Sequence, residues 1–175
     1  KRLSYLNEED AANLIEKPIW DKSRNRSRFL SNSIETIIDY TSANPFYIQS
    51  FCSRLVEYMN KNKIITVTEA DLEQIAEGFI SGEQSYTMQN FDNLISAGDA
   101  EVNPFSEEEV LEILRAIAIG SRNLDTCQRE SIDIGNKSKE DDILSDLESR
   151  EVIQRINQKY YKLKVRLFKE WLIKN

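Results

Sequence analysis

The period of the apolar residues changes once along this chain, and that change constrains the fold more than any other sequence feature. Over most of the first 149 residues, apolar residues recur every three or four positions, which is the spacing of one helix face. Near the end, Tyr161, Leu163 and Val165 alternate with polar neighbours, as in a half-buried strand. The pattern predicts a mainly α-helical protein whose last part contains a small β-hairpin.

The first hundred residues predict a helical bundle. A helix over 7–15 begins at the cap Asn7 with three acidic residues, which the helix dipole favours at that end, and Pro18 follows it. Further apolar stripes predict a helix around 34–41, one that starts at Asn44-Pro45, one that opens with a capping box at Thr68–Asp71, and one through Tyr86–Ile95.

The second part of the chain predicts a winged helix-turn-helix. Residues 97–105 combine turn-forming residues with little apolar periodicity, so we expect a linker there. Ser106 and Ser138 are the expected caps of two later helices, and the segment 121–137 between them is ambiguous. With the hairpin and a closing helix, the expected domains are a helical bundle over 1–98 and a winged-helix domain over 104–175.

The composition excludes several kinds of chemistry. There is no histidine, which rules out Ser-His-Asp triads, HExxH zinc sites and imidazole proton shuttles. There is also no GxxxxGK[ST] or GxGxxG motif, so this chain alone cannot bind and cleave a nucleotide. Acidic clusters such as 107–109 fall in the first turns of expected helices, where capping is the simpler interpretation. We therefore expect no catalytic residue and no metal site.

Cysteine use and hydropathy bear on the compartment. Cys52 and Cys127 lie far apart with no CxxC spacing, so we expect free thiols in a reducing compartment. No run approaches the roughly 18 apolar residues of a membrane span, and no signal-peptide pattern is present. These features predict a cytoplasmic protein without a membrane partner. Because the first residue is Lys1, we also expect a processed protein or a piece of a longer one.

The net charge of -7 averages over unlike regions. Residues 65–149 sum to -15 and residues 150–175 to +6. The expected recognition helix carries five carboxylates against one lysine within 139–148, which disfavours insertion into a DNA groove. In the hairpin, the residues expected to point outward together are Arg155, Lys159, Tyr160, Lys162 and Lys164. In rising order of preference, this edge contacts DNA, an acidic protein, or the acidic middle of the same chain.

A second basic cluster lies near the N-terminus. Arg24, Arg26 and Arg28 alternate between Trp20 and Phe29 and could meet a phosphate or an acidic partner, although pairing within the protein is the favoured interpretation. Trp20 and Trp171 are expected to be core or domain-interface anchors rather than ligand platforms.

One segment carries a family resemblance. Residues 41–49, T-S-A-N-P-F-Y-I-Q, resemble the T-G-G-N-P-Y-L-I-Q segment in the helical lid of STAND and related AAA-type P-loop ATPases, including archaeal and bacterial relatives of origin-recognition ATPases. Residues 6–18 are similar to the L-x-x-E-E-A-x-x-L-I-x-x-P helix that opens this lid, and 65–72 to the I-T-x-x-D-V start of a later lid helix. A winged helix follows the lid in these families, so the resemblance covers nearly the whole chain.

The resemblance implies that Asn44 and Pro45 abut the adenine of ATP or ADP, which an upstream core would bind. The nucleotide would then belong to the full-length protein, and no cofactor is expected for this piece alone. Two departures stand out: Ser42 and Ala43 replace the family's glycines, and Phe46 rather than arginine follows the proline, so we expect no sensor arginine there.

The expected function is that of a C-terminal regulatory fragment with no activity of its own. It would couple the nucleotide state of a possible full-length ATPase to contacts with its own ATPase core and with a protein partner. Two alternatives stay open, a winged-helix DNA-binding regulator and a nucleotide-independent protein-interaction adaptor.

Overall fold

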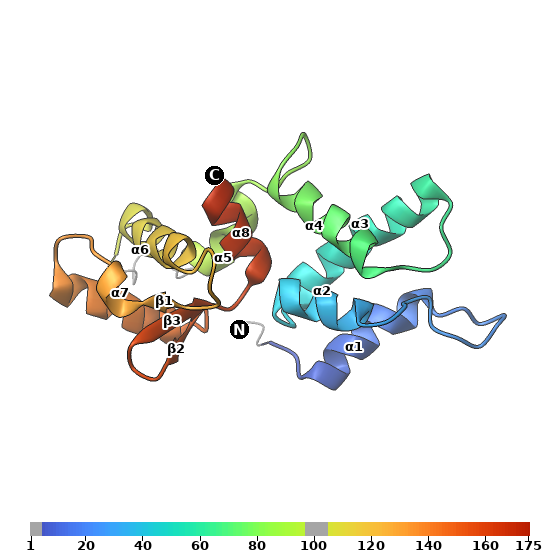
Figure 1. Ribbon diagram of the computed structural model, residues 1–175, viewed down its shortest axis with the longest axis horizontal. Coiled ribbons are helices and arrows are strands. Elements are labelled where there is room, and N and C mark those ends of the chain that lie inside the picture. Colours follow the sequence, from blue (N-terminus) through green and yellow to red (C-terminus); the bar gives the residue numbers. More distant parts are fainter. Residues whose placement is uncertain (1–4, 97–104) are drawn as a thin grey trace. The chain divides into compact units, whose positions relative to one another are not determined.

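The computed structural model describes residues 5–96 and 105–175, so all of the expected linker except Phe105 lies outside the described residues. Within that part of the chain the protein is mainly helical with one small antiparallel sheet, as the periodicity predicts (Figure 1). The α-helices are α1 (Glu8–Glu16), α2 (Ser33–Thr41), α3 (Pro45–Asn62), α4 (Glu69–Ile80), α5 (Asp92–Ile95), α6 (Glu107–Gly120), α7 (Lys137–Ser149) and α8 (Arg166–Lys174).

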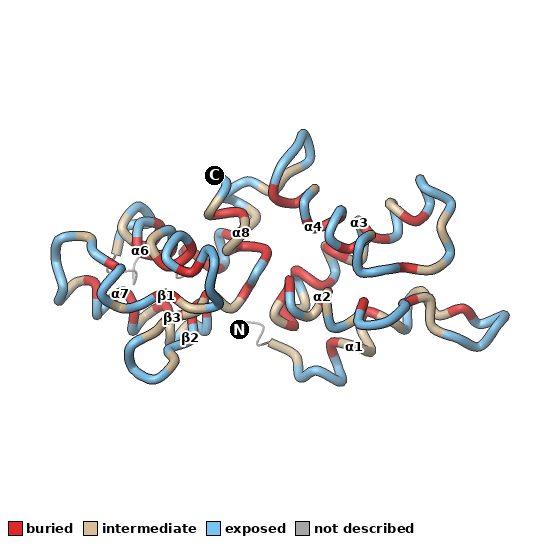
Figure 2. Tube along the Cα trace, in the orientation of Figure 1, coloured by how far each residue is buried: buried red, intermediate tan, exposed pale blue. Residues whose placement is uncertain are grey.

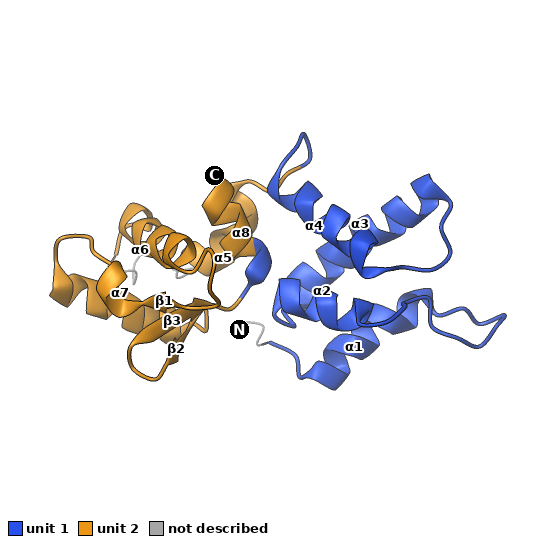
Figure 3. Ribbon diagram, viewed as in Figure 1, with its two compact units in different colours: residues 1–84, 165–167 blue, residues 85–164, 168–175 orange. Residues whose placement is uncertain are grey.

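Two compact units make up the fold (Figure 3). The first unit runs to Gln84 and includes Val165–Leu167, and the second contains Ser85–Lys164 and Phe168–Asn175. The division therefore falls after Gln84, earlier in the chain than the boundary expected within 97–105.

The first unit has its core where α2, α3 and α4 meet. The ring of Tyr40 stacks on Phe51 with 5.9 Å between centroids, and Phe51 stacks on Phe79 at 5.6 Å. Helix α1 adds Ala11 and Ile15, both fully buried. In Figure 2 buried and exposed positions alternate along α3 and α4, as expected for helices with one apolar face. Burial of each large side chain contributes about 1.5–3 kcal/mol, so these aromatic contacts hold the bundle together.

Local capping residues set where several helices begin. Asn7 accepts from the backbone of Asp10, and Thr68 forms the expected capping box with Asp71. Ser106 forms another box with Glu109. The expected cap Ser138 is wrong: Asn136 caps α7 by accepting from the backbone of Lys139. Asparagine and serine are similarly good N-caps, so local sequence alone does not choose between positions two residues apart.

The second unit has the element order of a winged helix. After α6 come β1 (Cys127–Gln128), α7, β2 (Ile153–Ile156) and β3 (Tyr160–Leu163), and the sheet order is β1-β3-β2. Between β1 and α7 stands only the 3₁₀ turn η3 (Arg129–Ser131), so the middle helix of the motif is reduced to one turn. Gly120 lets β1 lie close to α6, since a Cβ there would come within 2.4 Å of the Cys127 sulfur.

Residues 85–96 belong to the second unit because their apolar and backbone groups are taken up there. The ring of Phe91 packs 4.7 Å from Phe168 and 5.3 Å from Trp171, whose indole N–H donates to the Tyr86 carbonyl at 2.7 Å. The guanidinium of Arg150 donates to the carbonyls of Leu94, Ile95 and Ser96 at 3.1–3.3 Å. Trp171 is thus a core anchor of its own unit.

The single helix expected through Tyr86–Ile95 is wrong in its form. The structure has a 3₁₀ turn, η2 (Met88–Phe91), followed by the one-turn helix α5. Thr87 donates its backbone N–H and its hydroxyl to the Asn90 side chain, which fixes a tight first turn. The expected inward residues Phe91 and Leu94 are buried.

Candidate functional site

The segment that resembles the ATPase lid forms a tight turn between α2 and α3. The Thr41 hydroxyl donates to the Ile37 carbonyl at 2.7 Å, and the Asn44 N–H donates to the Thr41 carbonyl at 3.0 Å. Between them, Ser42 and Ala43 have φ of 53° and 56°, both in the left-handed region. Residues with a Cβ rarely adopt this conformation, which glycine adopts freely. The backbone therefore takes the shape that two glycines would favour, although neither residue is glycine.

Asn44 and Pro45 start α3 in the manner expected. The Asn44 side chain accepts from the Phe46 N–H at 3.0 Å, and its carbonyl accepts from Ile48 at 2.9 Å. Asn44 is buried, whereas Pro45 is half-buried and Phe46 is 46% exposed. This end of α3 thus presents an apolar edge beside a helix N-terminus, a combination that suits a flat heteroaromatic ring more than a phosphate.

The start of the first helical segment is joined to the same turn. The backbone N–H of Leu6 donates to the Ala43 carbonyl at 3.0 Å. Two segments that carry the family resemblance, 6–18 and 41–49, therefore meet at the left-handed turn.

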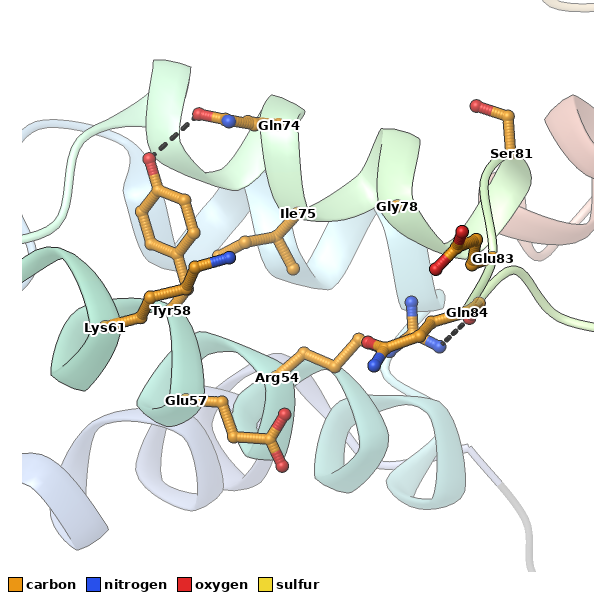
Figure 4. Close-up of a pocket in the computed structure, with 10 residues that line it drawn as sticks. All are labelled: Arg54, Glu57, Tyr58, Lys61, Gln74, Ile75, Gly78, Ser81, Glu83 and Gln84. Carbon is orange, nitrogen blue, oxygen red and sulfur yellow. Dashed lines mark hydrogen bonds between the residues drawn. The ribbon is translucent and has the colours of Figure 1, made fainter.

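Arg54 lies two turns further along α3 than Tyr47, and its charge is used within the unit. Its guanidinium stacks over the Phe79 ring at 3.7 Å and donates to the Gln84 carbonyl. The side chain borders a pocket of about 510 Å³ between α3 and α4 (Figure 4). Arg54 therefore supports the end of α4 and leaves the α3 N-terminus without an arginine.

The same pocket holds a tyrosine with a raised pKa. The Tyr58 hydroxyl donates to Gln74 at 2.9 Å and lies 3.2 Å from the Asp71 carboxylate (Figure 4). Burial and the Asp71 carboxylate raise the pKa of Tyr58, so it stays a neutral hydrogen-bond donor. Its partners are residues of α4, which gives the hydroxyl a structural role in joining α3 to α4.

The arginine loop near the N-terminus is organised around a buried carboxylate. Asp21 is 5% exposed and accepts from the backbone and hydroxyl of Ser23 and from the backbone of Arg24. The Ser23 hydrogen bond is the main cause that lowers the pKa of Asp21, and Arg28 and Arg24 add to it. The favoured interpretation of this cluster, pairing within the protein, agrees with that geometry. Trp20 beside it is half-buried.

The basic residues of the hairpin do not share one face. Cross-strand partners lie on the same face of a sheet, and Arg155 is opposite Tyr161 while Lys162 is opposite Gln154. The Arg155 guanidinium accordingly lies 5.5 Å from the Tyr161 ring. The register places Arg155 on the opposite face from Lys162, because neighbouring positions along a strand alternate in direction.

Three of these cations pair with acidic residues of their own unit. Arg155 pairs with Glu148 at 3.2 Å, Lys162 with Asp125 at 3.1 Å and Lys164 with Glu151 at 3.2 Å. Lys159 is exposed and Tyr160 half-buried. Glu148 and Asp125 belong to the acidic middle of the chain, so these contacts follow the preferred interpretation of the basic edge. A phosphate backbone would have to displace these carboxylates to reach Lys162 or Arg155.

Glu140, one of the five carboxylates of α7, is fully buried. Its oxygens accept from Arg129 at 2.9 Å and from the Ile134 N–H at 2.8 Å. Arg129 also donates to Asp141 at 2.8 Å. The sequence contains a signal for this burial, since Glu140 precedes the buried residues Ile143, Leu144 and Leu147 at helical spacing.

The cysteines and acidic groups offer no reactive centre within the described residues. Cys52 and Cys127 are free thiols, and burial raises the pKa of Cys52 to about 11 and that of Cys127 in the same direction. Across residues 5–96 and 105–175, no cluster of cysteine and carboxylate side chains is arranged to hold a metal ion. No helix in this part of the chain has the length and apolar character needed to cross a membrane.

Comparison of the whole chain with protein-family models, curated proteins and solved structures finds no match.

Proposed function

We propose that this chain is the lid and winged-helix portion of a P-loop ATPase of the STAND or AAA type, with a regulatory rather than a catalytic role. The observation that carries the proposal is the pair of left-handed residues Ser42 and Ala43 before Asn44-Pro45. Each such residue costs about 1–2 kcal/mol relative to a right-handed conformation. A chain that keeps this turn without glycine keeps it because the surrounding structure requires its shape.

The bond between Leu6 and Ala43 gives a second line of support. It joins the segment similar to the opening helix of the lid to the segment similar to T-G-G-N-P. Two separate sequence resemblances thus converge on one place in the first unit, and a winged-helix topology follows them in the second.

The proposed mechanism is conformational. The half-buried Pro45 and the exposed Phe46 would form the apolar edge that closes on an adenine held by an upstream core. Binding shifts a conformational equilibrium only as far as the nucleotide prefers the closed state, so this edge must contact nucleotide in one state more than in the other. The winged helix would transmit or restrain that closure through contacts with the core or a partner. Hydrolysis, if the intact protein performs it, would use residues of the core.

The coding sequence upstream of Lys1 tests the proposal at the lowest cost. We expect a GxxxxGK[ST] motif that follows a strand and precedes a helix, within a Rossmann-like core. An upstream region of a few hundred residues without this motif would contradict the proposal. The structural context matters, because an isolated match to the motif in a loop would not supply the phosphate site.

A further inference from the structure

An apolar groove runs along α6 in the second unit, apart from the turn and the hairpin. Its volume is about 700 Å³, and it is lined by α6 and by Met88 of the turn η2. Leu111 is nearly buried, whereas Ile119 is 61% exposed and Met88 44% exposed. Leu111 and Ile119 are eight residues apart on one helix, so the apolar floor extends for about 12 Å.

The exposure of these residues together is what distinguishes the groove. A single exposed apolar side chain, such as Leu124 at 68%, is ordinary on a protein surface. Met88, Leu111 and Ile119 instead line one pocket with Ala116 between them. Such a strip matches the length of two turns of a second helix.

The rim of the groove is acidic. Glu107, Glu108 and Glu112 line it, and Arg115 is the cation among the lining residues. Their neighbour Glu109 is turned to Lys139 and Ser106, which hydrogen-bond to it and lower its pKa. The charge of Glu109 is therefore satisfied within the unit, while the three lining carboxylates face the groove.

We propose that this groove binds a basic amphipathic helix of a partner protein. Apolar side chains two turns apart would cover Leu111 and Ile119, and lysine or arginine side chains at the edge would meet Glu108 and Glu112. Charge complementarity selects this occupant, because an acidic helix would bring like charges together at the rim.

A second copy of this chain is a poor occupant. Its basic helix α8 buries Phe168, Trp171 and Leu172 within its own unit, so its apolar face is not available. The partner therefore supplies the helix from another chain. The inference is independent of the nucleotide proposal, since no residue of the groove belongs to the segments that resemble the lid.

A synthetic two-heptad peptide of leucine and lysine, arranged to form one apolar face, is the probe. It is titrated into the isotopically labelled chain, and binding is followed by NMR shifts of backbone amides. We expect the largest shifts at Met88 and along 107–119. A peptide of the same composition in scrambled order keeps the charge but lacks the apolar face, and we expect it to bind at least about tenfold more weakly.

Two matched variants place the binding in the groove. Ile119→Lys should weaken binding by about tenfold or more, whereas Leu124→Lys, an equal change at an exposed residue outside the groove, should leave it within about twofold. The spectra of the free variants report whether each remains folded. Equal weakening by both variants, equal binding of a leucine and glutamate peptide, shifts centred on α7 or the hairpin, or self-association through α6 would each overturn the proposal.

Discussion

The turn before α3 and the basic hairpin were both candidates for contact with a ligand, and they are held in different ways. Ser42 and Ala43 are fixed by an unfavourable backbone conformation that buried neighbours enforce. The hairpin cations Lys162 and Lys164 are fixed by exposed ion pairs with Asp125 and Glu151. Exposed pairs of this kind contribute about 0–1 kcal/mol, and solvent readily exchanges them.

This difference separates a preorganised surface from an adaptable one. A strained turn persists only when the rest of the structure determines it, so its shape is the property that the fold maintains. The hairpin cations can leave their partners at little cost, but each must be released before it meets a phosphate. The comparison therefore favours the turn as the defined contact surface, and it makes predictions that can break or sharpen the contrast.

The largest effect is expected where a charge of the second unit is buried. Arg129→Ala removes the partner of the fully buried Glu140, and we expect a loss of about 3 kcal/mol in the free energy of unfolding. Urea denaturation measures this loss. In the double variant Arg129→Met with Glu140→Gln, much of the stability should return, because no unpaired charge remains. If the single variant costs no more than a hairpin lysine variant, burial does not separate the two kinds of ion pair.

A smaller effect of opposite sign is expected at the turn. Ser42→Gly should raise the free energy of unfolding by about 0.5–1 kcal/mol, because glycine relieves the left-handed strain. Ser50→Gly is the matched control, since Ser50 is also half-buried but lies inside α3. There glycine should lower stability by about 0.5 kcal/mol through its helix propensity. Destabilisation by both changes would mean that the turn carries no strain.

The smallest effects are expected in the hairpin. Lys162→Ala and Lys164→Ala should each change the free energy of unfolding by less than about 0.5 kcal/mol, because their ion pairs are exposed. Neither variant should alter a mobility shift with duplex DNA, since we expect no shift for the unaltered chain even at low salt. A shift that weakens steeply with salt and is lost in these variants would favour the DNA-binding alternative.

Local signals in the sequence account for much of the fold. The caps Asn7, Asn44, Thr68 and Ser106 act within three residues of themselves, and each starts a helix as expected. The alternation in the hairpin likewise reports its buried face directly, with Tyr161 and Leu163 inward.

Other features depend on contacts between residues far apart in the chain. Arg150 binds the carbonyls of 94–96 from more than fifty residues away, and no local pattern near either segment assigns 85–96 to the second unit. The face of Arg155 depends on the strand register, which composition does not specify. Glu140 is different, because its place on the apolar stripe of α7 was visible among the five carboxylates.

The most direct measurement of the central claim is amide hydrogen exchange of the full-length protein with and without ADP. The account predicts that ADP slows exchange over 44–49 and leaves 68–72 unchanged. That second segment is the capped N-terminus of α4 and serves as a matched control within the same unit. An intact protein that binds ADP while exchange over 44–49 stays the same, or changes equally over 68–72, would contradict the role assigned to Asn44 and Pro45.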